Sequence, residues 1–137
     1  MNILLDTGPI VAFLNKNDVH HNFVIEKMRN LTPPFTTCEA VLKESFFLMS
    51  RIPTGTARLI ELLEAGKIEL SDSYRTDSSK VHNLITGYAN VPMSFADACL
   101  VQMASVEKDS AVFTLDRDFL IYRNQKGGML SLICPFL

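Results

Sequence analysis

Short apolar runs that alternate with longer amphipathic segments constrain the fold of this chain most. Strand-like runs are predicted at residues 2–5, 35–37, 67–70, 111–115 and 129–133. Helical periodicity predicts helices between them, over residues 9–14, 18–30, 38–52, 56–65, 77–88, 94–107 and 119–122. Strands separated by helices pair in parallel, and the helices then cover both faces of the sheet. The sequence therefore predicts an α/β fold in three layers.

Length and cysteine content set the organisation of the chain. With 137 residues, the sequence suits a single domain over 1–137. No apolar run approaches the roughly 20 residues of a membrane span, and the first residues resemble a strand instead of a signal peptide. The three cysteines include no C-x-x-C spacing, which argues against a disulfide framework or a thiolate zinc site. We expect a soluble, cytoplasmic protein without membrane association.

Two aspartates follow predicted strands directly. Asp6 ends the first apolar run and Asp116 ends the fourth. Ligands of open α/β sheets bind beyond the carboxyl ends of the strands, which makes both residues candidates. Asp6 alone could equally serve as a turn or helix cap before Gly8. The alternation of strand side chains places Thr114 on the same side as Asp116, while Asp118 is either a cap for a short helix or a water-mediated ligand.

A third acid is expected from the helix that starts near Cys38. Glu39 has a structural explanation, because Thr36-x-x-Glu39 has capping-box spacing and Lys43 follows four residues later. Glu44 has no such partner and lies among apolar positions, which favours compensation by a cation. We therefore assign Glu44, and not Glu39, to a functional site.

A fourth acid lies in the most apolar helix. Asp97 is the one early charge of the segment 94–107. Ser94-x-x-Asp97 is compatible with a capping arrangement, and an acid there also suits the helix dipole. A first-turn carboxylate can still direct one oxygen at a cation, so Asp97 stays a candidate ligand.

Carboxylates that converge in one cleft repel each other unless a cation neutralises them. Ligand sets made only of oxygen select hard ions, so we expect Mg²⁺ or Mn²⁺. The pair His20-His21 is a poor zinc site, because adjacent side chains diverge and no third ligand is near in sequence.

Four segments together resemble the PIN-domain family, and specifically the small ribonucleases that act as toxins in toxin-antitoxin pairs. They are residues 3–9, 41–44, 95–98 and 113–119, which carry Asp6, Glu44, Asp97 and Asp116 in order. The resemblance implies a five-stranded parallel sheet of order 3-2-1-4-5, with the four acids as catalytic and metal-binding residues and Thr114 as a support. Gly8 departs from the small polar residue of many relatives.

The resemblance also implies metal-dependent hydrolysis of RNA phosphodiester bonds, an RNA substrate and a small antitoxin protein as partner. The formal net charge of −2 is unusual for an RNA-binding protein. If four acids bind metal, 13 basic residues face 11 remaining acids, a balance of +2. We expect a local basic rim for phosphate, with Arg117, Arg123 and Lys126 as candidates.

Two other functions compete with cleavage. A phospho-accepting receiver domain also has an acidic pocket, but Asp6 lacks the neighbouring acid and Cys134-Pro135 replaces the lysine expected after the last strand. A PIN-like module that binds RNA or protein without cutting is the second alternative. Metal-dependent cleavage separates these from a nuclease.

One further feature suggests a partner. The predicted helices 38–52 and 56–65 carry more apolar residues than one buried stripe uses, namely Phe46, Phe47, Leu59, Ile60, Leu62 and Leu63. Ordinary core packing is one explanation. The other is a surface for a homodimer or for an inserted antitoxin helix.

Overall fold

The computed structural model describes residues 1–137 and contains one parallel sheet of five strands. Their order is β3-β2-β1-β4-β5, which confirms the order expected from the family resemblance. The strands are β1 (Asn2–Leu5), β2 (Phe35–Thr37), β3 (Ile68–Leu70), β4 (Ser110–Phe113) and β5 (Leu132–Ile133).

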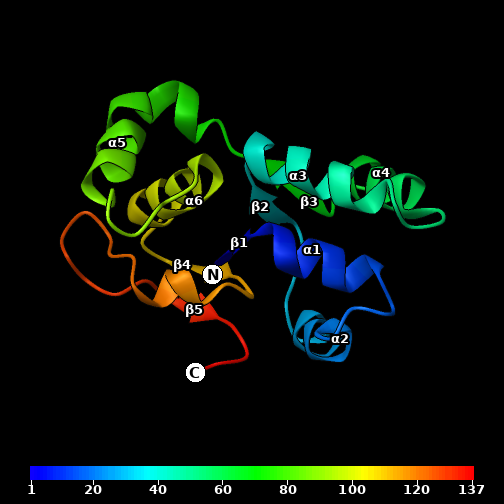
Figure 1. Cartoon of the computed structure of the whole chain (residues 1–137). Helices are drawn as coiled ribbons and strands as arrows, with labels where there is room; N and C mark the ends of the chain where they lie inside the picture. The colour runs from blue at the N-terminus through cyan, green and yellow to red at the C-terminus, as the bar shows by residue number, and fades with distance from the viewer.

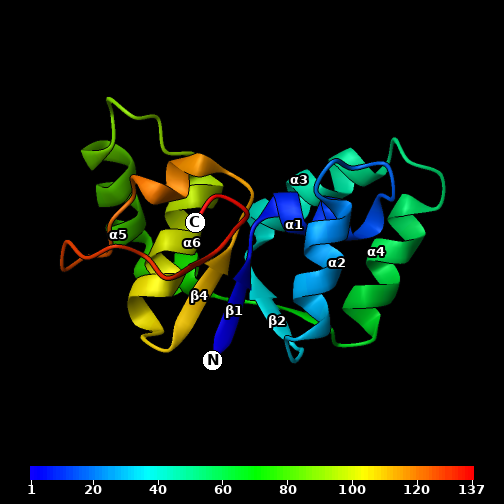
Figure 2. The ribbon, with the colours of Figure 1, turned by 90° about the horizontal axis from the view of Figure 1, so that it is seen from below.

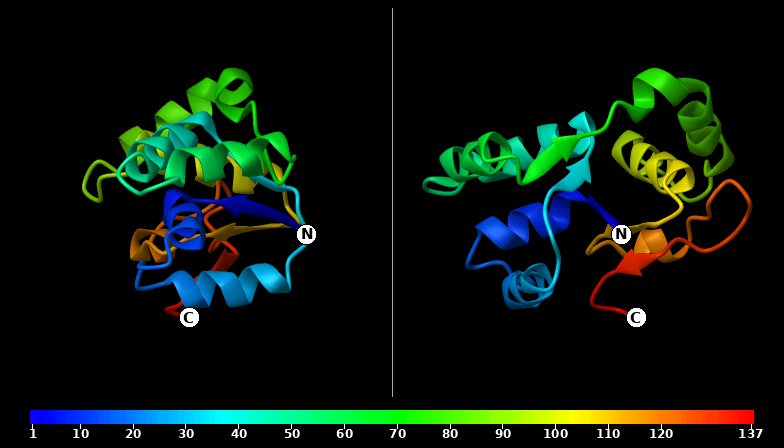
Figure 3. Two further views of the ribbon diagram at one scale, coloured as in Figure 1. Left: turned by 90° about the vertical axis from the view of Figure 1, so that its right-hand side faces the viewer. Right: turned by 180° about the vertical axis from the view of Figure 1, so that it is seen from behind.

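Helices cover both faces of this sheet (Figures 1 to 3). One face carries α1 (Thr7–Leu14), α2 (His21–Arg29), α3 (Glu39–Met49) and α4 (Gly55–Glu64). The other carries α5 (Ser73–Gly87) and α6 (Phe95–Val106), and the short helix η1 (Arg117–Leu120) follows β4. Right-handed crossovers explain the division, because the chain moves outward from β1 to β3 and then crosses back to β4 on the opposite face.

The core is centred on β1 and β4. These neighbours pair in register from Asn2 with Ser110 to Leu5 with Phe113. Both are covered on two sides, and Leu4, Val112 and Phe113 are completely buried. Strands buried on both faces are continuous apolar runs, which is why the sequence pattern predicted them without alternation.

Several element boundaries differ from the predicted ones. Helix α5 begins at Ser73, before the predicted start, and has a kink at Asp77, whose φ is −128°. Strand β5 is only two residues long. Gly66 ends α4 as predicted, since its φ of 72° is a left-handed conformation that glycine adopts at little cost.

The predicted capping box at the start of α3 is wrong. Thr36 lies inside β2, and its hydroxyl donates to Asn2 Oδ1 at 3.1 Å. Cys38 occupies the N-cap position without a side-chain bond, and Glu39 is exposed as the first helical residue. The T-x-x-E spacing gave a wrong prediction because β2 extends to Thr37, the residue before the N-cap, so Thr36 belongs to the strand.

The three cysteines, Cys38, Cys99 and Cys134, are buried free thiols. None of the helices combines the length and apolar character needed to cross a membrane.

Two glycines give a matched test of this packing. A methyl group on Gly55, at the start of α4, would overlap the carbonyl oxygen of Met49. Gly87, at the end of α5, has no neighbouring atoms in the way. We expect Gly55→Ala to cost about 1–3 kcal/mol of unfolding free energy, whereas Gly87→Ala should be neutral or stabilise by about 0.5 kcal/mol. Urea unfolding of both variants measures this, and equal stabilities would contradict the packing around α4.

Candidate active site

A cleft of about 610 Å³ opens at the carboxyl ends of β1 and β4. The chain leaves β1 towards α1 on one face of the sheet and reaches β4 from α6 on the other, so helices diverge here (Figure 2). Such reversal points are where open α/β sheets bind ligands. The cleft is lined by all four predicted acids, Asp6, Glu44, Asp97 and Asp116, and also by Asp18 and Asp118.

Asp6 is the most buried of these acids, with 8% of its surface exposed. Its Oδ1 accepts a bond from the backbone N–H of Thr7 at 2.8 Å, which caps α1. Its Oδ2 accepts from the hydroxyl of Thr114 at 2.7 Å. Burial raises the pKa of Asp6 to about 6, against the two hydrogen bonds, and the nearby charges of Asp97 and Asp116 add to the rise. Asp6 therefore caps α1 and lines the cleft at the same time, so the two roles expected from the sequence do not exclude each other.

Asp116 follows β4, the strand next to β1, and is exposed. Its backbone N–H donates to the Thr114 hydroxyl at 3.0 Å, so Thr114 connects the two aspartates. The side chain of Asp116 accepts from the N–H of Asp118 at 2.9 Å and caps η1. The cap of the short helix is thus Asp116, and Asp118 lies in its first turn at the edge of the cleft.

Asp97 enters the cleft from the first turn of α6. Ser94 caps that helix by accepting from the N–H of Asp97 at 3.0 Å, as its spacing suggested. The carboxylate is bound by Tyr122, whose hydroxyl donates to Oδ2 at 2.9 Å. Burial raises the pKa of Asp97, while the bond from Tyr122 opposes the rise and the charge of Asp116 adds to it. Burial and the contact with Asp97 likewise raise the pKa of the Tyr122 hydroxyl, which keeps it a donor.

Glu44 reaches the cleft from α3 and is exposed. Its Oε2 accepts a long hydrogen bond of 3.3 Å from the hydroxyl of Thr7. Glu39, in contrast, lies outside the lining of this cleft. The structure therefore brings Glu44 to the other acids, although the capping argument used to separate it from Glu39 was wrong.

Sequence reasoning missed three contributors to the cleft. Tyr122 is fully buried beneath Asp97, and Thr7 links Asp6 with Glu44. His20 lines the cleft, whereas the ring of His21 bonds the carbonyl of Ala12 at 2.6 Å. No sequence signal for Tyr122 existed, because its role depends on a contact with a residue 25 positions away.

The predicted basic rim is not part of the cleft lining, which contains no lysine or arginine. Arg117 lies over the ring of Phe136, 4.8 Å from its centroid. Arg123 donates Nη1 to the carbonyls of residues 120, 121 and 122, and Lys126 borders a separate hollow. Phosphate binding by these three residues stays a prediction, and His20 is the one lining side chain that can carry positive charge.

The donor set fits a hard divalent cation, since it consists of carboxylates and hydroxyls. The acids raise one another's pKa, a repulsion that a cation would relieve. No three His, Cys, Asp or Glu side chains form a ready coordination group, however. Oδ2 of Asp97 accepts from Tyr122 and Oδ1 of Asp116 accepts from the Asp118 N–H, which leaves the second oxygen of each carboxylate free to bind a cation.

Asp6→Asn tests the electrostatic cost of this arrangement. The folded protein holds a proton on Asp6 up to pH about 6, against 3.8 for an unperturbed aspartate, so the metal-free protein loses stability as pH rises through this window. Asparagine keeps the shape, and Thr114 can accept a bond from its amide. We expect Asp6→Asn to be more stable than the wild type at pH 7.5 in chelator, by up to about 3 kcal/mol.

Urea unfolding at pH 4 and pH 7.5 measures the effect as the difference between the two proteins. The gain should shrink towards pH 4, where Asp6 of the wild type is protonated in the folded state and already about 40% protonated in the unfolded state. A variant less stable than the wild type at pH 7.5 would contradict the assignment.

Comparison with known proteins agrees with this fold. VapC20 of Mycobacterium tuberculosis, described as a sarcin-ricin loop cleaving toxin, superposes with a TM-score of 0.72 at 17% identity, over 85% of this chain and 92% of that one. The VapBC2 structure from Rickettsia felis, bound to a DNA fragment from their promoter, gives a TM-score of 0.66 at 18% identity, over 98% and 99% of the two chains. No curated protein sequence matches significantly.

The sheet order also differs from the 2-1-3-4-5 order of receiver-type folds, which removes the signalling alternative. The sequence itself matches the family model described as PIN domain over residues 3–124. The match covers most of the chain, and the protein belongs to the PIN-domain family.

Proposed function

We propose that residues 1–137 act as one metal-dependent endoribonuclease domain of the toxin type. The observation that carries the proposal is the convergence of Asp6, Glu44, Asp97 and Asp116 from four separate elements on one cleft. Two of these acids have raised pKa values and none forms an ion pair with a basic side chain, which suits a cation-binding site better than a structural ion-pair network. The likeness to VapC20 supports RNA as the substrate.

The proposed roles follow from the environment of each carboxylate. A bound Mg²⁺ or Mn²⁺ would neutralise the phosphate and lower the pKa of an attacking water. Asp6 and Asp116 are the principal ligands, because both follow the central strands and share Thr114. Asp97 has Oδ2 fixed by Tyr122 and Oδ1 free, so Oδ1 can orient the water and accept its proton. Glu44, held at the opposite wall by Thr7, is a second or water-mediated ligand.

Cleavage of labelled single-stranded RNAs tests this proposal. We expect activity with Mg²⁺ or Mn²⁺ that chelator abolishes. Asp116→Asn should reduce kcat by at least about 100-fold, and Glu44→Gln by less, with both proteins folded. Asp109→Asn is the matched control, since this exposed acid pairs with the N-terminus at the opposite edge of the sheet.

Thermal unfolding with and without Mn²⁺ gives a second measurement. The ion should stabilise the wild type and not Asp116→Asn, because a ligand that binds only the folded state raises its stability. A wild type that binds RNA but cuts none with either metal would favour the non-catalytic alternative.

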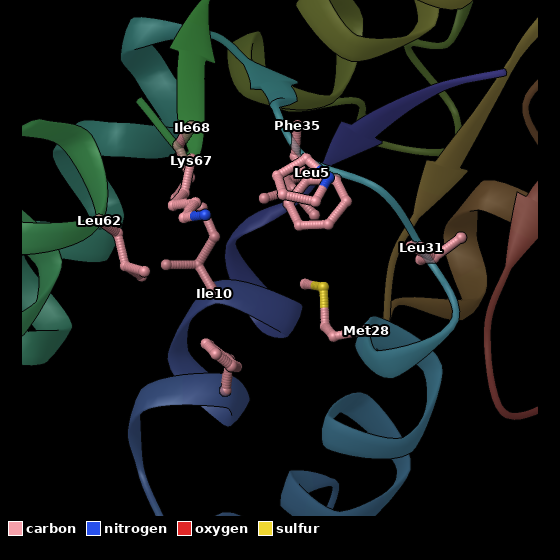
Figure 4. A pocket seen from close by; sticks show the side chains of 10 residues that line it. Leu5, Ile10, Met28, Leu31, Phe35, Leu62, Lys67 and Ile68 are labelled. Carbon is pink, nitrogen blue, oxygen red and sulfur yellow. The ribbon is translucent and has the colours of Figure 1, made fainter. Parts of the chain in front are cut away.

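We propose further that a small antitoxin protein restrains the enzyme by docking beside α1, α2 and α4. A cavity of about 220 Å³ opens there, lined by apolar side chains with Lys67 as the only charged one: Leu5, Ile10, Phe13, Met28, Leu31, Pro33, Phe35, Leu62 and Ile68 (Figure 4). Its floor includes Leu5, the residue before Asp6. An apolar side chain of a partner helix would fill the cavity, and an acid beside it would face Lys67.

The apolar excess of α3 and α4 is partly explained by this cavity. Leu59 is fully buried, Leu62 lines the cavity, and Ile60 and Phe47 are exposed. A homodimer over the exposed residues stays a prediction.

Leu62→Gln tests the docking surface, with Ile60→Gln as a control on the same helix but outside the cavity lining. We expect Leu62→Gln to cut RNA normally but to lose at least about 10-fold in affinity for the small protein encoded beside it, while Ile60→Gln changes neither. Titration calorimetry and growth rescue on co-expression measure both. Equal binding of the two variants would place the antitoxin elsewhere.

A further inference from the structure

A second pocket lies on the same edge of the sheet as the active-site cleft. It has a volume of about 480 Å³ and is built where β2 and β3 end and α3, α5 and α6 begin. We call it the β2–β3 edge pocket. Strand β2 is the direct neighbour of β1, at a sheet spacing of about 4.8 Å, so the pocket begins next to the strand that carries Asp6. Both sites therefore lie at the carboxyl ends of the strands.

Two aromatic rings border the pocket. Tyr74 and Phe95 are 41% and 45% exposed, and their centroids are 4.9 Å apart in an edge-to-face arrangement. The hydroxyl of Tyr74 lies 3.0 Å from Nε2 of His82, which fixes the ring. Phe95 lies two residues before Asp97, at the start of α6. Rigid, exposed rings beside a nuclease cleft are suited to stacking against an unpaired nucleobase.

The polar groups of the pocket also suit a base. Ser73 is only 9% exposed, and its Oγ has no hydrogen-bond partner within the protein. Buried hydroxyls are rarely left unpaired, so this atom is available to a ligand. Glu39 and Asp72 add two exposed carboxylates to the lining. They repel phosphate, but they can accept hydrogen bonds from the amino group of cytosine or adenine.

We propose that the β2–β3 edge pocket binds one nucleobase of the RNA substrate next to the cleavage site. Phe95 stacks on the base, and Tyr74, perpendicular to it, meets the edge of the base. Glu39 and Asp72 select bases that carry an exocyclic amino group, and Ser73 adds a hydrogen bond to the base. Arg75 also lines the pocket, is largely exposed and lies 3.8 Å from Asp72, so its guanidinium is the cationic group available to the phosphate of this nucleotide. The inference rests on the proposed ribonuclease function and extends it to substrate selection.

Binding can be measured separately from cleavage. The full chain carrying Asp6→Asn and Asp97→Asn, in chelator, has two fewer carboxylates in the cleft and does not turn over the RNA. Fluorescence anisotropy then reports the affinity for short labelled oligonucleotides of cytidine, adenosine or uridine. In this background we expect Phe95→Ala to weaken binding of the cytidine oligomer about 5- to 150-fold, the range for loss of one stacked base. Phe95→Tyr, which retains a ring, should bind like the parent.

Two comparisons make the assignment specific. Val106→Ala removes an exposed apolar side chain from the far end of α6 and should leave affinity unchanged. Glu39→Ala should reduce the preference for cytidine and adenosine over uridine, and Ser73→Ala should weaken the binding of all three. An abasic nucleotide at the stacked position should weaken binding to the parent but not to Phe95→Ala.

The outcomes separate this inference from the proposed function. Metal-dependent cleavage by the wild type, together with undiminished RNA binding by folded Phe95→Ala, would overturn the pocket alone. Failure of the parent to bind or cut any RNA would overturn both. If Phe95→Ala binds RNA normally but loses a protein partner, the aromatic pair belongs to a protein interface and the nucleobase assignment is wrong.

Discussion

The site depends on a carboxylate held in a poorly hydrated position at the end of the central strand. Asp6 is almost fully buried, and only the Thr7 N–H and the Thr114 hydroxyl compensate its charge. The bond to Thr114 joins residues 108 positions apart and aligns the ends of β1 and β4. Hydrogen bonds to neutral donors do not offset the burial, so the pKa of Asp6 remains high. The folded chain thus maintains an unfavourable charge arrangement that a cation would relieve.

The same constraint organises the surrounding residues. Tyr122 fixes one oxygen of Asp97, Thr7 reaches Glu44, and the Asp118 N–H holds Asp116. Each acid therefore has a hydroxyl or amide donor and none has a cationic partner in the cleft lining. Neutral donors position carboxylates without cancelling their charge, which leaves them able to attract metal. Carboxylates that are positioned but still charged suit the proposed metal-dependent hydrolysis. The need to bind a cation also explains why the cleft of a protein expected to bind RNA is acidic.

Much of the fold could be predicted from sequence because burial on two faces produces continuous apolar runs. Residues 2–5 and 35–37 were identified with their observed bounds, and Gly66 ended its helix as expected. Prediction was poorer where few contacts determine the structure, as in the two-residue strand β5 and the kinked start of α5. The Thr36-x-x-Glu39 spacing misled because a local motif cannot reveal that Thr36 is paired within a sheet.

By itself, the sequence determined which acids follow strands or begin apolar helices, since those positions depend on local pattern. Asp6, Asp97 and Asp116 were recognisable in this way, and together with Glu44 they resembled the PIN pattern. Only the tertiary structure decided that Thr7 and His20 line their cleft, that the buried Tyr122 bonds Asp97, that carbonyl groups engage Arg123, and that Tyr74 meets Phe95. Hydrogen bonds, ring contacts and desolvation depend on distances between residues far apart in the chain, and the order of strands sets those distances.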